Sequence, residues 1–215
     1  PLQIQDLYDR LGEIRSPRTV RRLHEVLHNA LQRAVEVWRL IPVNPTSAAK
    51  PPKQTKREMS FLTFDQAQGW LKELRGDPLE SLHLTAIMTG MRQGELLGLR
   101  WSDINWDAGT MTVSQTVWIW KKQPIFKPYP KGGEPRTLPL TPIIVAKLRA
   151  QRAAQAQSKL LAGAEYVDHD LVWARENGLP LRHEYVREHF HRSLKAAALP
   201  TIRFHDLRHS AASLL

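Results

Sequence analysis

The sequence predicts an α-rich α+β fold, in which a helical domain and a linker precede a mixed domain with a small antiparallel sheet. Three observations support this prediction. Apolar residues recur at helical spacing over most of the chain, and two short segments before residue 141 alternate as strands. The stretch 44–58 contains Pro, Ser, Ala and Lys without periodicity, which is typical of a linker. We therefore expect domains at 1–43 and 59–215.

The first domain is expected to contain two helices. Residues 3–14 carry apolar side chains at helical spacing, and Ser16-Pro17 is a typical start for a second helix over about 17–40. Its apolar stripe runs from Val20 to Trp38. Each arginine outside the stripe suits a solvated face, but as a group they favour a surface that faces DNA. The predicted DNA-binding residues, from this helix and from the linker, are Arg18, Arg21, Arg22, Lys53, Lys56 and Arg57. For the linker residues, a soluble tether without DNA contacts is an equal alternative.

The second domain is expected to begin with a capped helix. Thr63 can cap its N-terminus, and Gln66 occupies the capping-box position. Helices and strands then follow in a mixed order. The predicted helices lie at about 64–74, 78–89, 92–99, 141–161 and 183–197, with a last one from about 205. The predicted strands lie at 109–118, 136–140 and 171–173, with a loop over 127–134.

Composition narrows the classes of partner. The 215 residues carry a formal net charge of +10, which favours a polyanion, most commonly nucleic acid. The alternative is a basic protein that has no polyanionic partner, and charge alone does not exclude it. The lack of Cys excludes a disulfide scaffold and a thiolate zinc site, and it fits a reducing cytosol. No apolar run approaches about 20 residues, so no membrane partner is expected.

Two stretches carry side chains suited to binding a phosphate. Arg92 follows Gly90 at the head of a predicted helix, and Glu95 lies one turn later to orient it or to cap the helix. His205 and Arg208 are three residues apart, so both leave one face of the last predicted helix. That pair can grip an anionic oxygen and move a proton. For the first stretch, a surface Arg–Glu pair is the alternative.

Lys131 is the candidate proton donor. It lies in a Gly-containing loop between two predicted strands, from which it can reach a cleft and protonate a leaving oxygen. A solvated loop lysine is the alternative, and Lys127 is the rival if the loop has a different register. The histidines lack a carboxylate in a metal-binding pattern, so neither a metal nor a cofactor is expected.

These stretches resemble the tyrosine recombinase (phage integrase) family. The resemblance rests on Thr-Gly-Met-Arg-Gln-Gly-Glu-Leu-Leu-Gly-Leu-Arg-Trp-Ser-Asp-Ile at 89–104, on Lys131 ahead of Arg136-Thr-Leu-Pro-Leu, and on His205-x-x-Arg208-His. The first domain is similar to the end of the family's helical core-binding domain. The resemblance thus covers nearly the whole chain.

The resemblance implies site-specific DNA recombination. Arg92 and Arg208 would hold the non-bridging oxygens of the scissile phosphate, Lys131 would protonate the leaving 5′ oxygen, and His205 would accept or donate a proton. The family's nucleophile is a tyrosine that forms a 3′-phosphotyrosyl bond. The implied partners are double-stranded DNA at attachment sites and further copies of the chain, in a tetramer on that DNA. A cytoplasmic, nucleoid-associated protein of a bacterium or phage is expected.

The tyrosines depart from the family pattern. The family's tyrosine follows the His-x-x-Arg helix, whereas Tyr8, Tyr129, Tyr166 and Tyr185 all precede it. We therefore expect a fragment, with an N-terminally incomplete first domain and a C-terminally truncated second one, that binds DNA but does not cleave it alone. The alternative is a non-catalytic DNA-binding protein that keeps the integrase fold.

Overall fold

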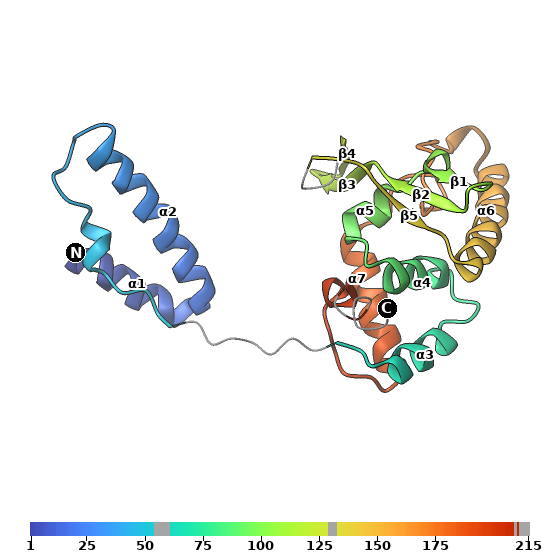
Figure 1. The fold of residues 1–215 in the computed structure, drawn as a ribbon, viewed down its shortest axis with the longest axis horizontal. Helices are drawn as coiled ribbons and strands as arrows, with labels where there is room; N and C mark the ends of the chain where they lie inside the picture. The colour runs from blue at the N-terminus through green and yellow to red at the C-terminus, as the bar shows by residue number, and fades with distance from the viewer. Residues whose placement is uncertain (54–60, 129–132, 209, 211–215) are drawn as a thin grey trace. The chain divides into compact units, whose positions relative to one another are not determined.

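The computed structural model describes residues 1–53, 61–128, 133–208 and 210. The chain divides into two compact units, Pro1–Glu58 and Met59–Leu215 (Figure 1). Among the residues described, no helix combines the length and the apolar character that crossing a bilayer requires. Each unit is built around its own group of buried side chains.

The first unit contains two helices, α1 (Leu2–Ile14) and α2 (Pro17–Glu36). The expected start of α2 is confirmed, because the Ser16 hydroxyl accepts a hydrogen bond from the Thr19 amide at 3.3 Å and Pro17 occupies the first turn. Tyr8 of α1 and Val20 of α2 are buried together with Ala49. These contacts join the helix pair to the segment that follows it.

The second helix ends earlier than the sequence pattern predicts. It stops at Glu36 rather than near residue 40, and Trp38, which the pattern places on the buried stripe, is exposed. The reason lies in the backbone. Arg39 adopts a left-handed conformation with φ 50°, and the Leu40 amide turns back to donate to the Ala34 carbonyl at 2.9 Å.

Residues 44–50, assigned from composition to the linker, form ordered structure beside α2. Pro45–Ala48 is a 3₁₀ turn, η1. The buried Asn44 side chain donates to the His28 carbonyl at 3.1 Å and to the Gln32 side chain at 2.9 Å. Thr46 is also buried and pairs with the His28 ring at 2.9 Å. Side-chain hydrogen bonds to α2 therefore fix a segment that lacks any apolar periodicity.

Helices contribute more residues than strands to the described part of the second unit. The capping box at Thr63 and Gln66 is confirmed by hydrogen bonds of 3.0 and 3.3 Å. Trp70, Trp173 and Phe190 are among its largest buried side chains. The helices are α3 (Phe64–Glu73), α4 (Glu80–Thr89), α5 (Gln93–Gly98), α6 (Pro142–Ala162) and α7 (His183–Ala196). Short 3₁₀ turns lie at η2 (Trp101–Asp103), η3 (Gly163–Glu165) and η4 (Phe204–Asp206).

Among the described residues, the strands form two antiparallel sheets rather than the single small sheet that the sequence predicts. One sheet has the order β1-β2-β5, and the other is the ribbon β3-β4 (Figure 1). Their bounds are β1 Ile104–Asn105, β2 Thr110–Val113, β3 Gln115–Trp120, β4 Gln123–Pro128 and β5 Arg136–Pro139. The region 171–173, predicted as a strand, contributes only an isolated bridge from Leu171 to Arg100.

A break at Ser114 explains the second sheet. The predicted strand over 109–118 divides there into β2 and β3, because the Ser114 hydroxyl bonds to Asp103 at 2.8 Å and to Arg100 at 3.1 Å. The strand β4 ends at Pro128, so it overlaps the predicted loop over 127–134. Its two prolines, Pro124 and Pro128, discourage a strand assignment, yet an outer strand tolerates them.

Glycines let the helix α5 lie directly on the strand β3. A Cβ added at Gly98 would lie 3.1 Å from the Val117 nitrogen and 3.2 Å from the Gln115 carbonyl oxygen. At the preceding turn, Gly94 faces the Val117 carbonyl. Since those neighbours are backbone atoms of a paired strand, they cannot move aside easily.

Substitution Gly98→Ala should therefore destabilise the second unit by about 1–3 kcal/mol through overpacking. Thermal unfolding measures this loss. The matched control is Gly69→Ala in α3, where an added Cβ meets nothing within 4 Å. That variant should be stabilised by about 0.5–1 kcal/mol, because alanine loses less backbone entropy in a helix than glycine does. Equal effects at the two positions would contradict the close packing of α5 on β3.

Candidate phosphate-binding site

The site is built on the tight turn between α4 and α5. The helix α4 ends at Thr89, and Gly90 follows in the left-handed conformation with φ 60° and ψ 24°. Glycine adopts this conformation without steric cost. Met91 is buried, and Arg92 is the N-cap of α5. The turn thus places Arg92 at the positive end of a short helix.

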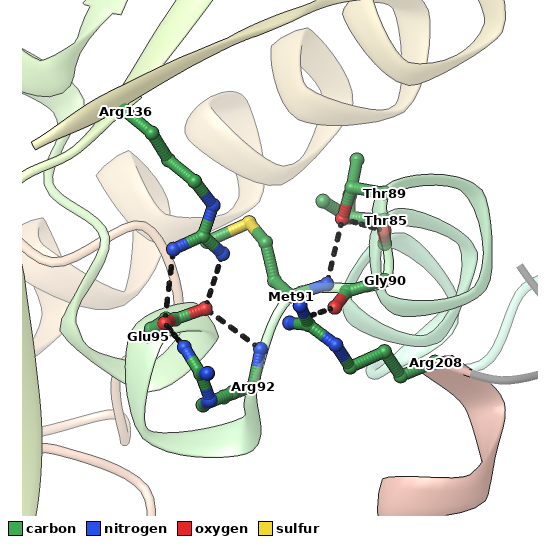
Figure 2. A network of polar contacts seen from close by, with 8 residues as sticks. All are labelled: Thr85, Thr89, Gly90, Met91, Arg92, Glu95, Arg136 and Arg208. Carbon is green, nitrogen blue, oxygen red and sulfur yellow. Dashed lines mark hydrogen bonds and ion pairs between the residues drawn. The ribbon is translucent and has the colours of Figure 1, made fainter. Parts of the chain in front are cut away.

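Glu95 is the centre of the site. Its side chain is fully buried, with an exposed fraction of 0%. The Arg92 amide donates to Glu95 Oε2 and the Arg92 guanidinium to Oε1, both at 2.8 Å. From β5, Arg136 makes a two-pronged contact with the same carboxylate, at 3.1 and 2.6 Å (Figure 2). One buried carboxylate therefore holds two arginines from different parts of the sequence.

The network determines the charge of Glu95. Burial alone would raise the pKa of this carboxyl, but hydrogen bonds from Arg136 and then from Arg92 outweigh burial, and the pKa lies below its ordinary value. Glu95 is therefore an anion near neutral pH. Both guanidinium groups remain partly accessible, with exposed fractions of 39% for Arg92 and 34% for Arg136. Their outer N–H groups can bind a second anion.

A third arginine reaches the same turn from the C-terminal segment. The Arg208 guanidinium donates to the Gly90 carbonyl at 3.0 Å (Figure 2). Gly90 and Arg92 are two residues apart, so this bond brings the C-terminal segment to the start of α5. The chemical result is a positively charged site with several N–H donors on one turn, suited to an anionic oxygen compound such as a phosphodiester.

His205 lies on the same segment as Arg208. The sequence predicts a helix from about residue 205, whereas the structure has the 3₁₀ turn η4 over Phe204–Asp206 before helical residues at Leu207 and Arg208. The guanidinium of Arg203 holds the buried Asp206 carboxylate at 2.9 and 2.7 Å, which fixes the turn. His205 itself is exposed to solvent.

The other predicted residues fall in three places. Arg18, Arg21 and Arg22 are exposed on α2 in the first unit, and Arg22 pairs with Glu25 at 3.2 Å. Lys53 is also exposed. Lys131, Lys56 and Arg57 lie outside the described residues. Within the described ranges, no group of three or more His, Asp or Glu side chains is arranged to hold a metal ion.

Arg136 is the site residue that sequence reasoning missed. The pattern placed it at the start of a strand and gave it no role. Arg136 and Glu95 are 41 residues apart, so no helical spacing links them. The available signal in the sequence is an arginine at the beginning of a predicted strand, shortly after the candidate proton donor Lys131.

The fold belongs to the class of tyrosine recombinase catalytic domains, and the predicted α-rich α+β class is confirmed. Similar solved structures include the Tn1549 transposon integrase in complex with a circular intermediate DNA, with a TM-score of 0.82 and 18% identity. That match covers 98% of this chain and 70% of the other. A lambda integrase tetramer bound to a Holliday junction matches with a TM-score of 0.67 and 22% identity, covering 98% of this chain and 56% of the other.

The chain belongs to the phage integrase family, whose model matches residues 60–215. The "Tyrosine recombinase XerC-like" protein of Caldanaerobacter subterraneus subsp. tengcongensis is 28% identical over 100% of this chain and 59% of its own length. "Tyrosine recombinase XerC" of Halalkalibacterium halodurans is 31% identical over 84% of this chain and 56% of its own length. The resemblance found in the sequence is thus confirmed. The chain spans somewhat more than half the length of these relatives.

Proposed function

We propose that this chain is the DNA-binding and phosphate-activating part of a tyrosine-type site-specific recombinase. The observation that carries the proposal is the buried Glu95 carboxylate, which holds Arg92 and Arg136 beside the turn that Arg208 contacts. A phosphodiester becomes more negative as a nucleophile adds to it. Guanidinium groups fixed in advance stabilise that extra charge without reorganising during the reaction.

In the proposed reaction, the phosphoryl group is transferred from DNA to a tyrosine and back to DNA, without net hydrolysis. A tyrosine hydroxyl of the whole protein attacks the phosphorus, and the bond from phosphorus to the 5′ oxygen breaks, which leaves a 3′-phosphotyrosyl bond. Arg92 and Arg208 hold the non-bridging oxygens. His205 takes the tyrosine proton, and Lys131 gives a proton to the leaving 5′ oxygen. A second DNA end reverses the steps, so the bond energy is conserved and the proposal includes no nucleotide cofactor.

The proposed substrate is double-stranded DNA at attachment sites. The net charge of +10 supports it, as do the exposed arginines Arg18, Arg21 and Arg22 on one helix. Lys53, Lys56 and Arg57 are proposed as further phosphate contacts. By analogy with the lambda integrase tetramer on a Holliday junction, we also propose a homotetramer on DNA. Such a protein would act on chromosomal DNA in the cytoplasm.

A nicked suicide duplex tests the catalytic function. On such a substrate the cleaved end diffuses away, so the whole protein should accumulate as a covalent protein–DNA adduct that survives denaturing electrophoresis. Phosphotyrosine should be the linkage, identified by mass spectrometry of the trapped peptide. Binding to the duplex without any adduct would instead support the alternative, a DNA-binding protein that keeps the fold without catalysis.

A further inference from the structure

The ribbon formed by β3 and β4 has two unlike faces. Residues alternate between them, and the pairing of Trp118 with Ile125 and of Trp120 with Gln123 sets the register. On the inner face, Val117 is buried and Phe126 packs against the core and the His169 ring. The inner face thus anchors the ribbon to the second unit.

Further contacts hold the base of the ribbon next to the candidate site. The strand β3 lies on α5, the helix whose N-cap is Arg92. The ring of His183, at the start of α7, bonds to the Val117 carbonyl at 2.9 Å. Gln93 in the first turn of α5 donates to the His183 carbonyl at 2.9 Å. Figure 1 shows β3 beside α5. The ribbon is therefore positioned with respect to Arg92.

The outer face carries two large exposed aromatic rings. Trp118 and Trp120 have exposed fractions of 41% and 56%, and their ring centroids are 6.2 Å apart. The Lys127 ammonium lies over the Trp118 ring, 5.2 Å from its centroid. Neither tryptophan belongs to the buried core of the second unit, so the exposure of two adjacent rings favours an external binding partner.

The turn that joins the two strands contains an unfavourable pair of residues. Lys121 and Lys122 have φ angles of 47° and 66°, as a two-residue type I′ turn requires. Asn and Gly occupy such positions at low cost, whereas lysine pays for the left-handed conformation. Two consecutive lysines therefore occupy this turn despite a local cost in backbone energy. In place of the residues that this turn prefers, the two lysines put two positive charges at the tip of the ribbon.

The charge of the ribbon identifies the chemistry of the partner. Residues 114–128 contain three lysines and no carboxylate. Lysines with neighbouring exposed aromatic rings fit the phosphates and the apolar sugar and base surfaces of nucleic acid. A two-stranded ribbon also has the width that the major groove of B-DNA admits.

We propose that the β3–β4 ribbon is a duplex-DNA-binding element, with Lys121 and Lys122 on phosphates and the Trp118–Trp120 face against the groove. This inference rests on the proposed function, because it assigns a further DNA contact to the same protein. The ribbon grips DNA next to the helix that begins at Arg92. Its lysines add affinity and its tryptophans fix the position of the duplex.

A double variant separates binding from folding. Lys121→Asn with Lys122→Gly supplies the residues that the turn prefers, so the thermal midpoint should stay constant or rise. The same change removes two phosphate contacts. In anisotropy titrations of a labelled duplex, affinity should fall roughly 10- to 100-fold at about 0.1 M salt, and the slope of log affinity against log salt should become shallower by about 2. Lys72→Gln with Lys195→Gln, which removes two exposed lysines from α3 and α7, is the charge-matched control and should change neither quantity by as much.

A second variant examines the aromatic face. Trp118→Thr with Trp120→Thr keeps residues suited to a strand and should weaken duplex binding roughly tenfold with an unchanged salt slope. Wild-type-like affinity and slope in both variants would overturn the ribbon proposal while leaving the proposed function intact. A loss confined to single-stranded probes, or a changed oligomeric state with unchanged duplex affinity, would also overturn it. If the wild-type protein did not bind the duplex, the proposed function itself would fail.

Discussion

Replacing Arg92 or Arg208 with alanine should lower the rate of strand cleavage about a thousandfold or more. Each guanidinium is proposed to stabilise charge that appears only in the transition state, and removing such a group has effects of about this size. DNA affinity should fall much less, by less than about tenfold, since each arginine is one of several phosphate contacts. The measurements are adduct formation on the suicide duplex and anisotropy titration of an intact duplex, both with the whole protein.

An arginine outside the candidate site is the matched control. Arg187→Ala removes an exposed arginine from α7 and should leave both quantities nearly unchanged. Arg208→Ala also removes the hydrogen bond to the Gly90 carbonyl, whose loss costs about 0.5–1.5 kcal/mol of stability. The thermal midpoint of each variant should therefore be recorded. If affinity and cleavage fell by the same factor in folded variants, the arginines would be binding residues without a special role in the transition state.

Replacing Glu95 with glutamine should destabilise the second unit by about 3–5 kcal/mol. The substitution preserves shape but leaves two guanidinium groups facing a neutral amide at a fully buried position, and breaking a buried ion pair in this way has a cost of this order. The loss is expected as a lower denaturant midpoint with little change in slope. Glu188→Gln on the exposed surface of α7 is the matched control and should shift stability by less than about 0.5 kcal/mol.

The pKa of Glu95 adds a pH signature to this prediction. Because the folded-state pKa lies below the ordinary value, the carboxylate contributes stability that is fully present above about pH 4.5. That contribution is lost as the pH falls through the folded-state pKa. The free energy of unfolding of the wild-type protein should therefore decrease more steeply in this acid range than that of Glu95→Gln. Parallel pH curves for the two proteins would show that Glu95 is not the anion that holds the arginines.

Local patterns in the sequence account for the helices and for part of the site. The cap at Thr63 and the spacing of Arg92 and Glu95 are short-range signals, and the structure confirms both contacts. The strand β4 was not predicted, because Pro124 and Pro128 favour a loop in the sequence. Only the pairing of β4 with β3 shows that this segment is a strand. Similarly, the end of α2 depends on the left-handed conformation of Arg39, which the apolar periodicity does not predict.

Long-range contacts explain what the sequence could not provide. Arg136 meets Glu95 only because β5 pairs with β2 in a register that places Arg136 opposite Val113. Arg208 meets Gly90 across 118 positions of sequence. Both contacts result from the tertiary fold. The sequence alone does not show which distant residues the fold brings together. The proposed roles of Arg92 and Arg208 rest on the resemblance to a family, whereas the buried position of Glu95 between two arginines is seen only in the structure.

The contact between Arg208 and Gly90 has a consequence for how this site tolerates genetic change. The acceptor is a main-chain carbonyl, so no side-chain substitution at the turn can delete it. Point mutations at the turn would disturb the bond by reshaping the backbone, as a bulkier residue at the left-handed Gly90 would do. Insertions and deletions between α4 and α5 would instead move the carbonyl itself. Lineages carrying this protein should therefore keep the length of this turn constant.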